Sequence, residues 1–298
     1  MTAQARSAAL AGIGFMLLGV FLFSINDAVG KWLVSTYSVG QLLFIRSGTT
    51  LLLLMPLIWR AGRDAFTSAP RPGLQVLRVL VGAAEVAMFF WAVTYLPLAD
   101  AVTFYLAGPI YVAAISALFL GERVGWRRWC AVIVGFIGVV IALRPSAAMF
   151  TLPALIALAG SLAFALLMII TRMLRTTDDI VLMSSQMFGT FVIGAIWTPF
   201  VWVAPSAFDL IFLSGFGAIS VVALFSVNRS LKLAPASVVV PYQYTLLLWA
   251  VLFGWWFFGE VPDLYTLLGG AIIVAAGLYI FWREQVKARE TAFAAPPA

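Results

Sequence analysis

Ten runs of apolar residues occupy almost the whole chain, and they constrain its fold more than any single motif. A helix needs ~20 consecutive apolar residues to cross the hydrocarbon core of a bilayer. Hydrophobic residues make up 63% of the 298 residues and charged residues 10%, too few charges to cover the surface of a soluble fold. We therefore expect an all-α membrane protein with ten transmembrane helices. The predicted helices are 9–33, 38–59, 74–95, 98–120, 125–143, 152–174, 180–203, 209–231, 236–258 and 264–282.

The residue types that are missing narrow the chemistry. The sequence contains no His and a single cysteine, Cys130. His is the commonest general base and a frequent metal ligand, and neither His-Glu-x-x-His nor Gly-x-Gly-Asp occurs. The predicted helices leave no room for a soluble catalytic domain. We expect no enzyme activity, no metal and no cofactor.

The basic residues are distributed unevenly between the two sides of the membrane. With the N-terminus in the cytoplasm, 14 Lys and Arg residues fall in the inner connections, and Lys31 and Arg144 fall in the outer ones. Positive charge favours the cytoplasmic side. The sequence therefore predicts a multi-pass protein of a bacterial-type inner membrane with both termini cytoplasmic. Because the charges lie at helix ends, the net charge of +6 indicates topology and not a nucleic-acid partner.

Two short patterns recur at one spacing. The turn at Leu96-Pro97 opens a predicted helix that ends at Gly121-Glu122, and the turn at Ala234-Pro235 opens one that ends at Gly259-Glu260; the offset is 138 residues in both cases. Chance similarity of two apolar helices is the alternative explanation. A repeat predicts two five-helix halves, and halves with an odd number of helices lie inverted in the membrane. The predicted repeats are 1–147 and 148–284, followed by a cytoplasmic tail, 285–298, that we expect to be disordered.

These blocks resemble the EamA-type drug/metabolite transporters. The similarity rests on the sequence from Tyr95 to Arg123 and its echo from Leu233 to Glu260, and Val261 departs from the basic residue that the family places after Gly-Glu. The resemblance implies export or exchange of small metabolites, and one bacterial branch exports aromatic and other amino acids. It also implies alternating access around a cavity between the halves, lined by the first, third, fourth, sixth, eighth and ninth helices.

The expected function is therefore a secondary transporter that exports small metabolites, with aromatic or apolar amino acids favoured. Another metabolite or a drug-like solute is the alternative substrate, and an intramembrane enzyme or a non-transporting scaffold is the alternative class. The expected partners are the small-molecule substrate and membrane lipid, with a coupling proton as a further candidate. No oligomer is required.

Ionisable residues inside the predicted helices are the first site candidates, because each is costly in a bilayer. Glu85 lies near the midplane of the third helix, and Arg46 lies at a similar depth in the second. Glu85 either pairs with Arg46 or meets a substrate amine or a coupling proton. Asp27 and Lys31 are four residues apart, which favours an ion pair on one helix face. The deeper Asn26 could bind both ends of a zwitterion through its amide.

Prolines inside two repeat-equivalent helices are the second signal. Pro109 and Pro241 lack an N–H, so each releases the carbonyl four residues earlier, at Tyr105 and Ser237. The prolines either bend helices that merely pack, or they shape an aromatic, partly polar wall. The substrate-binding candidates are Asn26, Glu85, Phe89, Trp91, Tyr105, Ser237, Tyr242 and Gln243. The candidates for structural or gating roles are Arg46, Glu122, Arg123 and Glu260.

Overall fold

The computed structural model describes residues 3–119, 126–142, 151–174, 176–233 and 239–294. The described segments are helical, and no strand occurs in these ranges. The α-helices are α1 (Ala3–Val34), α2 (Val39–Thr67), α3 (Pro72–Tyr95), α4 (Leu98–Leu106), α5 (Gly108–Phe119), α6 (Trp126–Ala142), α7 (Leu152–Met173), α8 (Asp179–Trp197), α9 (Ala207–Leu233), α11 (Thr245–Phe258) and α12 (Leu264–Ala294). Two 3₁₀ segments, η1 (Thr198–Phe200) and η2 (Val240–Tyr244), complete the set.

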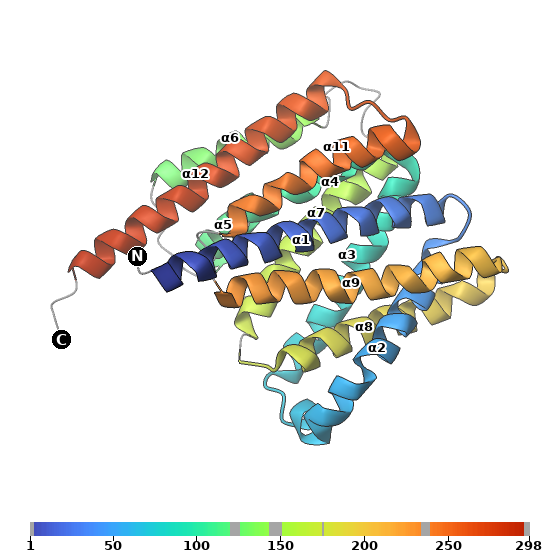
Figure 1. The fold of residues 1–298 in the computed structure, drawn as a ribbon. Helices are drawn as coiled ribbons and strands as arrows, with labels where there is room; N and C mark the ends of the chain where they lie inside the picture. Colours follow the sequence, from blue (N-terminus) through green and yellow to red (C-terminus); the bar gives the residue numbers. More distant parts are fainter. Residues whose placement is uncertain (1–2, 120–125, 143–150, 175, 234–238, 295–298) are drawn as a thin grey trace.

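The long helices lie side by side in one bundle (Figure 1). In this view α6 and α12 form one edge, α2 and α8 form the other, and α1 and α9 run between them. The first helix begins on the same side of the bundle on which α12 ends. An even number of crossings places the two ends of a chain on one side of a membrane.

Helices of the first half pair with helices of the second half in a reciprocal pattern. In the predicted repeat, α1 corresponds to α7 and α3 corresponds to α9. The first helix packs on α9, and α3 packs on α7, so these two contacts are equivalent to each other. The pairs α2–α8, α4–α11 and α6–α12 each join two equivalent helices. Two repeats related by a two-fold axis would produce this pattern. The inversion of the halves in the membrane, and the boundaries 1–147 and 148–284, stay predictions.

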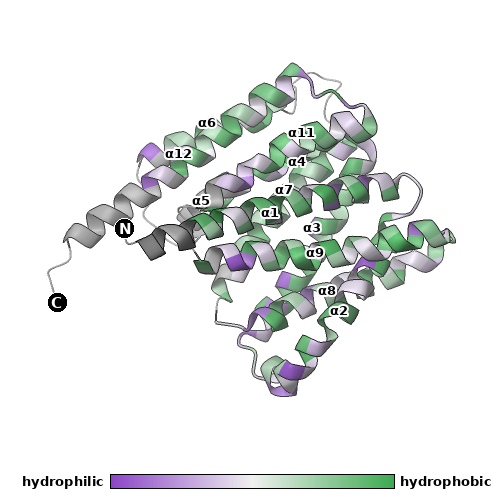
Figure 2. Cartoon of the chain, in the orientation of Figure 1, coloured by the Kyte–Doolittle hydropathy of each residue, from purple (hydrophilic) through white to green (hydrophobic). Residues whose placement is uncertain are grey.

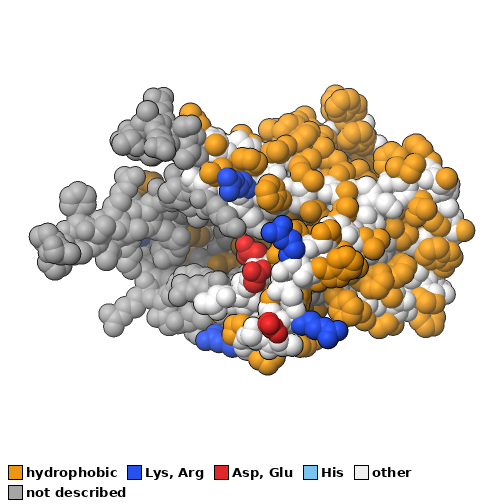
Figure 3. Space-filling model, turned by 60° about the horizontal axis from the view of Figure 1, so that its bottom comes forward, with side chains coloured by type: hydrophobic (Ala, Val, Ile, Leu, Met, Phe, Trp, Pro, Cys, Tyr) orange, Lys and Arg blue, Asp and Glu red, His pale blue; other side chains and the backbone are white. Residues whose placement is uncertain are grey.

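The outer surface of the bundle is apolar. Figure 2 shows hydrophobic residues along nearly every described helix, and Figure 3 shows apolar side chains over much of the described part of one face, with a few charged side chains near its centre and lower edge. Six described helices are long and apolar enough to cross a bilayer: Leu10–Val34, Val39–Thr67, Pro72–Tyr95, Leu152–Thr171, Asp179–Phe200 and Ala207–Ser230. Shorter apolar helices span Leu98–Val112, Trp129–Ala142 and Leu264–Ile280. The prediction of an all-α membrane protein is confirmed, and the count of ten spans stays a prediction.

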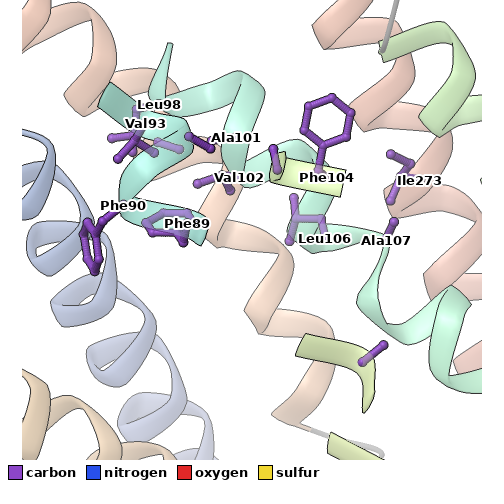
Figure 4. Packing of buried hydrophobic residues seen from close by; sticks show 14 of the residues in the cluster. Phe89, Phe90, Val93, Leu98, Ala101, Val102, Phe104, Leu106, Ala107 and Ile273 are labelled. Carbon is purple, nitrogen blue, oxygen red and sulfur yellow. The ribbon is translucent and has the colours of Figure 1, made fainter. Parts of the chain in front are cut away.

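The main hydrophobic core lies where α3 and α4 meet the second half. Phe89 and Phe90 of α3, Phe104 of α4 and Ile273 of α12 belong to one cluster of buried side chains (Figure 4). The short α4 is buried along most of its length. The core therefore surrounds the first part of the helix predicted at 98–120.

Several elements differ from the predicted boundaries; in the helix predicted at 236–258, for example, the 3₁₀ segment η2 precedes α11, which begins at Thr245. The helix predicted at 98–120 is divided into α4 and α5 at Ala107, two residues before Pro109, because a proline cannot continue the ladder of backbone hydrogen bonds. The second helix continues beyond residue 59 to Thr67 across a kink at Gly62, whose φ is 74°. The last helix continues through the expected disordered tail to Ala294, where Lys, Arg, Glu, Gln and Ala favour helix.

Glycine allows α6 and α12 to approach through their backbones. A Cβ added at Gly269 would lie 2.6 Å from the carbonyl oxygen of Gly138 and 2.7 Å from the Cβ of Ala142. Such distances force one helix to move. In contrast, a Cβ at Gly215 in α9 would meet nothing within 4 Å.

We expect Gly269→Ala to lower the free energy of unfolding by about 1–3 kcal/mol, because the added methyl overpacks a helix contact. Thermal unfolding of the detergent-purified protein measures this. The matched control, Gly215→Ala, should leave stability unchanged or slightly raised, since alanine favours helix over glycine. Equal stability of the two variants would contradict the close packing of α6 on α12.

Candidate functional site

Three charged side chains from the first three helices face one region inside the bundle. Asp27 of α1, Arg46 of α2 and Glu85 of α3 are all half-buried. Arg46 interacts electrostatically with both carboxylates. Neither carboxylate lies within the 4.0 Å of the guanidinium that defines an ion pair in the described part of the chain. The three charged groups are therefore close enough to interact electrostatically, and they form no direct ion pair with one another.

Neither of the two ion pairs considered from the sequence is formed in the described residues. Arg46 does not bond to Glu85 directly, and Lys31 does not turn back to Asp27. Lys31 instead bonds to Glu260 at the end of α11, 2.5 Å away. The reason is the tertiary environment of Lys31, which offers a carboxylate and a free carbonyl from other helices. Asp27 is thereby left to interact with Arg46.

Arg46 is held in place by α9 and by two aromatic rings. Its Nε donates a hydrogen bond of 3.3 Å to the Oγ of Ser220. Its guanidinium carbon lies 4.9 Å from the ring centre of Phe216 and 5.8 Å from that of Phe90. Cations are attracted to the faces of aromatic rings at such distances. The hydroxyl and the rings therefore fix the orientation of the guanidinium without neutralising its charge.

Asn26 reaches the site through the same serine. Its Nδ2 donates to the Oγ of Ser220 at 2.5 Å and to the backbone oxygen of Phe216 at 3.3 Å. The asparagine is 2% exposed, so these bonds satisfy an amide that would otherwise be costly to bury. Asn26 thus joins α1 to α9 and supports Ser220, and its amide nitrogen does not point at an open space.

A close approach of α2 and α9 makes these contacts possible. A Cβ at Gly217 would lie 2.6 Å from the backbone oxygen of Arg46. Thr50 of α2 donates to the backbone oxygen of Gly217 at 3.2 Å. With a larger residue at this position, α9 would move away and Ser220 would lose Arg46. Ser220 was not predicted, since one serine in an apolar helix is a weak signal without knowledge of its neighbours.

Aromatic side chains form a continuous wall beside the charges. Tyr105 of α4 donates through its hydroxyl to the backbone oxygen of Glu85 at 3.3 Å. Its ring packs edge-on against Phe89 at 5.1 Å between centres, and Phe89 contacts Phe90 at 5.2 Å. Phe90 in turn contacts Phe216 at 5.5 Å. The structure therefore brings together Glu85, Phe89 and Tyr105 from the predicted set and adds Phe90 and Phe216.

The remaining predicted residues lie elsewhere or outside the described ranges. Trp91 contacts Tyr95 near the end of α3, with 4.8 Å between ring centres. Tyr242 packs against the small cluster of Met16, Val20 and Val239, and it and Gln243 belong to η2. Of the two prolines, Pro109 lies in α5 and Pro241 in η2. Ser237, Glu122 and Arg123 lie outside the described residues.

Two carboxylates and one guanidinium beside an aromatic wall suit a small molecule with groups of both charges. A guanidinium binds a carboxylate with two parallel hydrogen bonds, and carboxylates bind ammonium groups. Aromatic faces can stack on a ring or a cationic group. Buried charges on helices that cross a bilayer mark pathways for substrates or ions.

Known proteins share this architecture. The EamA-like transporter family matches residues 10–144 and again residues 151–282. The chain belongs to the EamA-like transporter family. The two matches confirm the resemblance inferred from the Pro and Gly-Glu patterns and identify the fold as two repeats. The protein is therefore a multi-pass membrane protein and a small-molecule transporter.

Curated relatives within the family carry different substrates. An S-adenosylmethionine uptake transporter of Rickettsia conorii is 28% identical over 280 residues, 93% of this chain and 94% of that protein. A pseudopaline exporter of Pseudomonas aeruginosa is 28% identical over 271 residues, 89% of this chain and 94% of that protein. A riboflavin transporter of Rhizobium johnstonii is 27% identical over 290 residues, 96% of each chain.

A solved crystal structure supports the fold independently. It superposes with a TM-score of 0.61 at 17% sequence identity, covering 92% of this chain and 95% of that one. At this identity the comparison concerns the fold alone. The fold is therefore shared across sequences that have diverged widely.

The lack of a direct ion pair at Glu85 leads to a prediction. Removing one partner of a direct buried pair typically costs 3–5 kcal/mol. Because Glu85 does not bond directly to Arg46, we expect Glu85→Gln to unfold at nearly the parent temperature and yet lose most transport. The control is Asp64→Asn, which removes an exposed acid near the end of α2 and should leave both properties unchanged. A large loss of stability in Glu85→Gln would show that the acid is structural.

Proposed function

We propose that this protein carries amphoteric metabolites, with a carboxylate and at least one amine or other cationic group, across the bacterial inner membrane. Amino acids and amino-acid-bearing cations belong to this class. The observation that carries the proposal is the arrangement of Asp27, Arg46 and Glu85 around one interior region without a direct ion pair among them.

Arg46 is the proposed receptor for the substrate carboxylate. Ser220 engages its Nε, and Phe90 and Phe216 contact the guanidinium through ring faces. No hydrogen bond from its two terminal nitrogens occurs within the described residues. Those nitrogens supply the paired donors that match a carboxylate in geometry and charge. A lysine at this position could not make the same paired contact.

Asp27 and Glu85 are the proposed receptors for positive groups of the substrate. Together with Arg46, they leave the site with one excess negative charge when both acids are ionised. A neutral zwitterion would leave that excess, whereas a substrate with one further cationic group would balance it. S-adenosylmethionine, which the Rickettsia relative takes up, has a carboxylate, an ammonium and a sulfonium group. Its ring system would also suit the aromatic wall of Phe89, Phe90 and Tyr105.

The amino-acid substrate expected from the sequence falls within this class, and aromatic amino acids would use the same wall. The expected direction, export, stays a prediction, because the relatives include an uptake transporter and an exporter. A proton is the alternative partner of Glu85. A substrate and a proton competing for one carboxylate would couple their movements in opposite directions.

The proposed mechanism is alternating access between two inverted five-helix repeats, with ten spans in all. Three observations support it: the two family matches, the reciprocal pairing of helices between the halves, and the start of α1 and the end of α12 on one side of the bundle. The charged residues come from α1, α2 and α3, whereas Ser220 and Phe216 come from α9. The site therefore spans both repeats, so a movement of one repeat against the other would change it.

Uptake of radiolabelled solutes into proteoliposomes tests the substrate class. We expect S-adenosylmethionine or an aromatic amino acid to be transported, and the corresponding decarboxylated amine to be transported at least about tenfold less efficiently, the size of one charge-assisted contact. Arg46→Gln should remove that preference for the carboxylate. Applying a pH gradient in the same assay tests proton coupling. Equal transport of acid and amine by the parent protein would contradict the assignment of Arg46.

Single cysteines in a Cys130→Ser background test the inverted topology. Residues 123 and 261 follow the two Gly-Glu pairs, and inversion places them on opposite sides of the membrane. An impermeant thiol reagent should therefore label Val261→Cys from outside and Arg123→Cys only after access to the cytoplasmic side. Labelling of both positions from the same side would overturn the inverted repeat.

A further inference from the structure

Lys31 and Glu260 form a salt bridge between the two halves of the protein, and this salt bridge does not include the charges of the candidate site. The Nζ of Lys31 on α1 lies 2.5 Å from the Oε1 of Glu260, which follows the end of α11. Lys31 is four residues after Asp27, so the two lie on one face of α1, about one helical turn apart. Lys31 is therefore one turn from the candidate site along α1, and it lies closer than Asp27 to the end of that helix.

Both members of the pair also bond to the turn between α3 and α4. The Nζ of Lys31 donates to the backbone oxygen of Leu96 at 2.6 Å. The Oε2 of Glu260 accepts from the backbone N–H of Leu98 at 2.9 Å. That carboxylate thus caps α4, where a negative charge is favoured by the helix dipole. Three segments, α1, the α3–α4 turn and the end of α11, are held together by two side chains.

The backbone at the end of α11 directs Glu260 toward this turn. Gly259 has a φ of 65°, a left-handed conformation that glycine adopts without steric cost. Its N–H bonds to the backbone oxygen of Trp255, and the N–H of Glu260 bonds to that of Gly254, both at 3.0 Å. The Gly-Glu pattern therefore has a structural role in the second half: Gly259 ends α11, and the side chain of Glu260 reaches the turn between α3 and α4.

The pair is enclosed but keeps contact with the outside of the bundle. The side chain of Lys31 is 11% exposed and that of Glu260 is 23% exposed. A crevice of about 160 Å³ opens beside Lys31, lined by Lys31, Trp32, Ser35, Val93, Thr94 and Phe258. Water can therefore reach these charges when they separate, which lowers the cost of breaking the bond below that of a fully buried pair.

We propose that Lys31 and Glu260 are the gate of this end of the transporter: they hold it closed when bonded and open it when they separate. By the predicted topology this is the outer end. Opening frees the Leu96 oxygen and the Leu98 N–H at the same time, so the α3–α4 turn is released together with α1. Because Asp27 and Lys31 share α1, a substrate bound at Asp27 acts on the helix that carries the gate.

Other polar contacts at this end serve as an internal comparison. Tyr37, after α1, donates to Asp209 of α9 at 2.6 Å. Gln41 of α2 exchanges two hydrogen bonds with the backbone of Val203, at 2.7 and 3.0 Å. Tyr37 is 4% exposed and Gln41 is fully buried. Neither contact is an ion pair, and both lie among buried groups beside α2, α8 and α9. We therefore assign them no part in opening the gate.

Labelling of a cysteine at position 93 tests the gate. Val93 is fully buried and lines the crevice beside Lys31. In a Cys130→Ser, Val93→Cys background, an impermeant thiol reagent should react slowly from the outside of vesicles. Adding Lys31→Met or Glu260→Gln should raise the rate about tenfold or more, because each change removes a contact present in the closed state alone. Tyr37→Phe is the matched control and should leave the rate unchanged.

Each outcome decides the proposal. An unchanged rate in both Lys31→Met and Glu260→Gln overturns it, and so does an equal rise in Tyr37→Phe, which would indicate general loosening. Lys31→Arg keeps the charge and should label as slowly as the parent, which excludes a defect caused by any change at residue 31. Labelling needs no substrate, so a failure here is distinguishable from a failure of the proposed substrate class.

Discussion

The central constraint on this structure is the cost of placing Arg46 and its two acidic neighbours inside a bundle that lies in lipid. An ionised group in a low-dielectric interior is tolerated when other groups replace its hydration. Ser220, Phe90, Phe216 and the carboxylates of Asp27 and Glu85 share that task around Arg46. A direct salt bridge would be a simpler arrangement. Its absence in the described residues leaves the charges available to a solute.

Close packing of the helices positions the groups that surround Arg46. Lipid chains are as apolar as the helices, so helix association depends on close backbone contact and on hydrogen bonds between helices. Gly217 brings α9 against α2, which places Ser220 at Arg46. Gly269 brings α12 against Gly138 of α6 in the same manner at the other edge of the bundle. Small residues thus determine where the polar side chains of separate helices meet.

The fold was largely predictable from the sequence, and the site was predictable in part. Apolar runs and Lys/Arg asymmetry are properties of local sequence, and the recurring Pro and Gly-Glu patterns indicated the family. Glu85 and Arg46 stood out because a charge within an apolar helix is rare. Ser220 and Phe216 did not, because serine and phenylalanine are common in such helices. The predicted partner of Lys31, Asp27, was wrong. The i, i+4 spacing on a helix identifies only neighbours along the chain, and Glu260 lies 229 positions away.

The sequence by itself determined the environment, the helical class and the family, and it singled out the unusual charges within the helices. These depend on composition and on the period of a helix, which act over a few turns of the chain. Tertiary structure decided which charges meet, since each helix can rotate about its axis at little cost to its own hydrogen bonds. Contacts with other helices set that rotation: α9 through Gly217 and Ser220, and the turn at Leu98 through Glu260. The candidate site and the proposed gate depend on those contacts and not on any one segment.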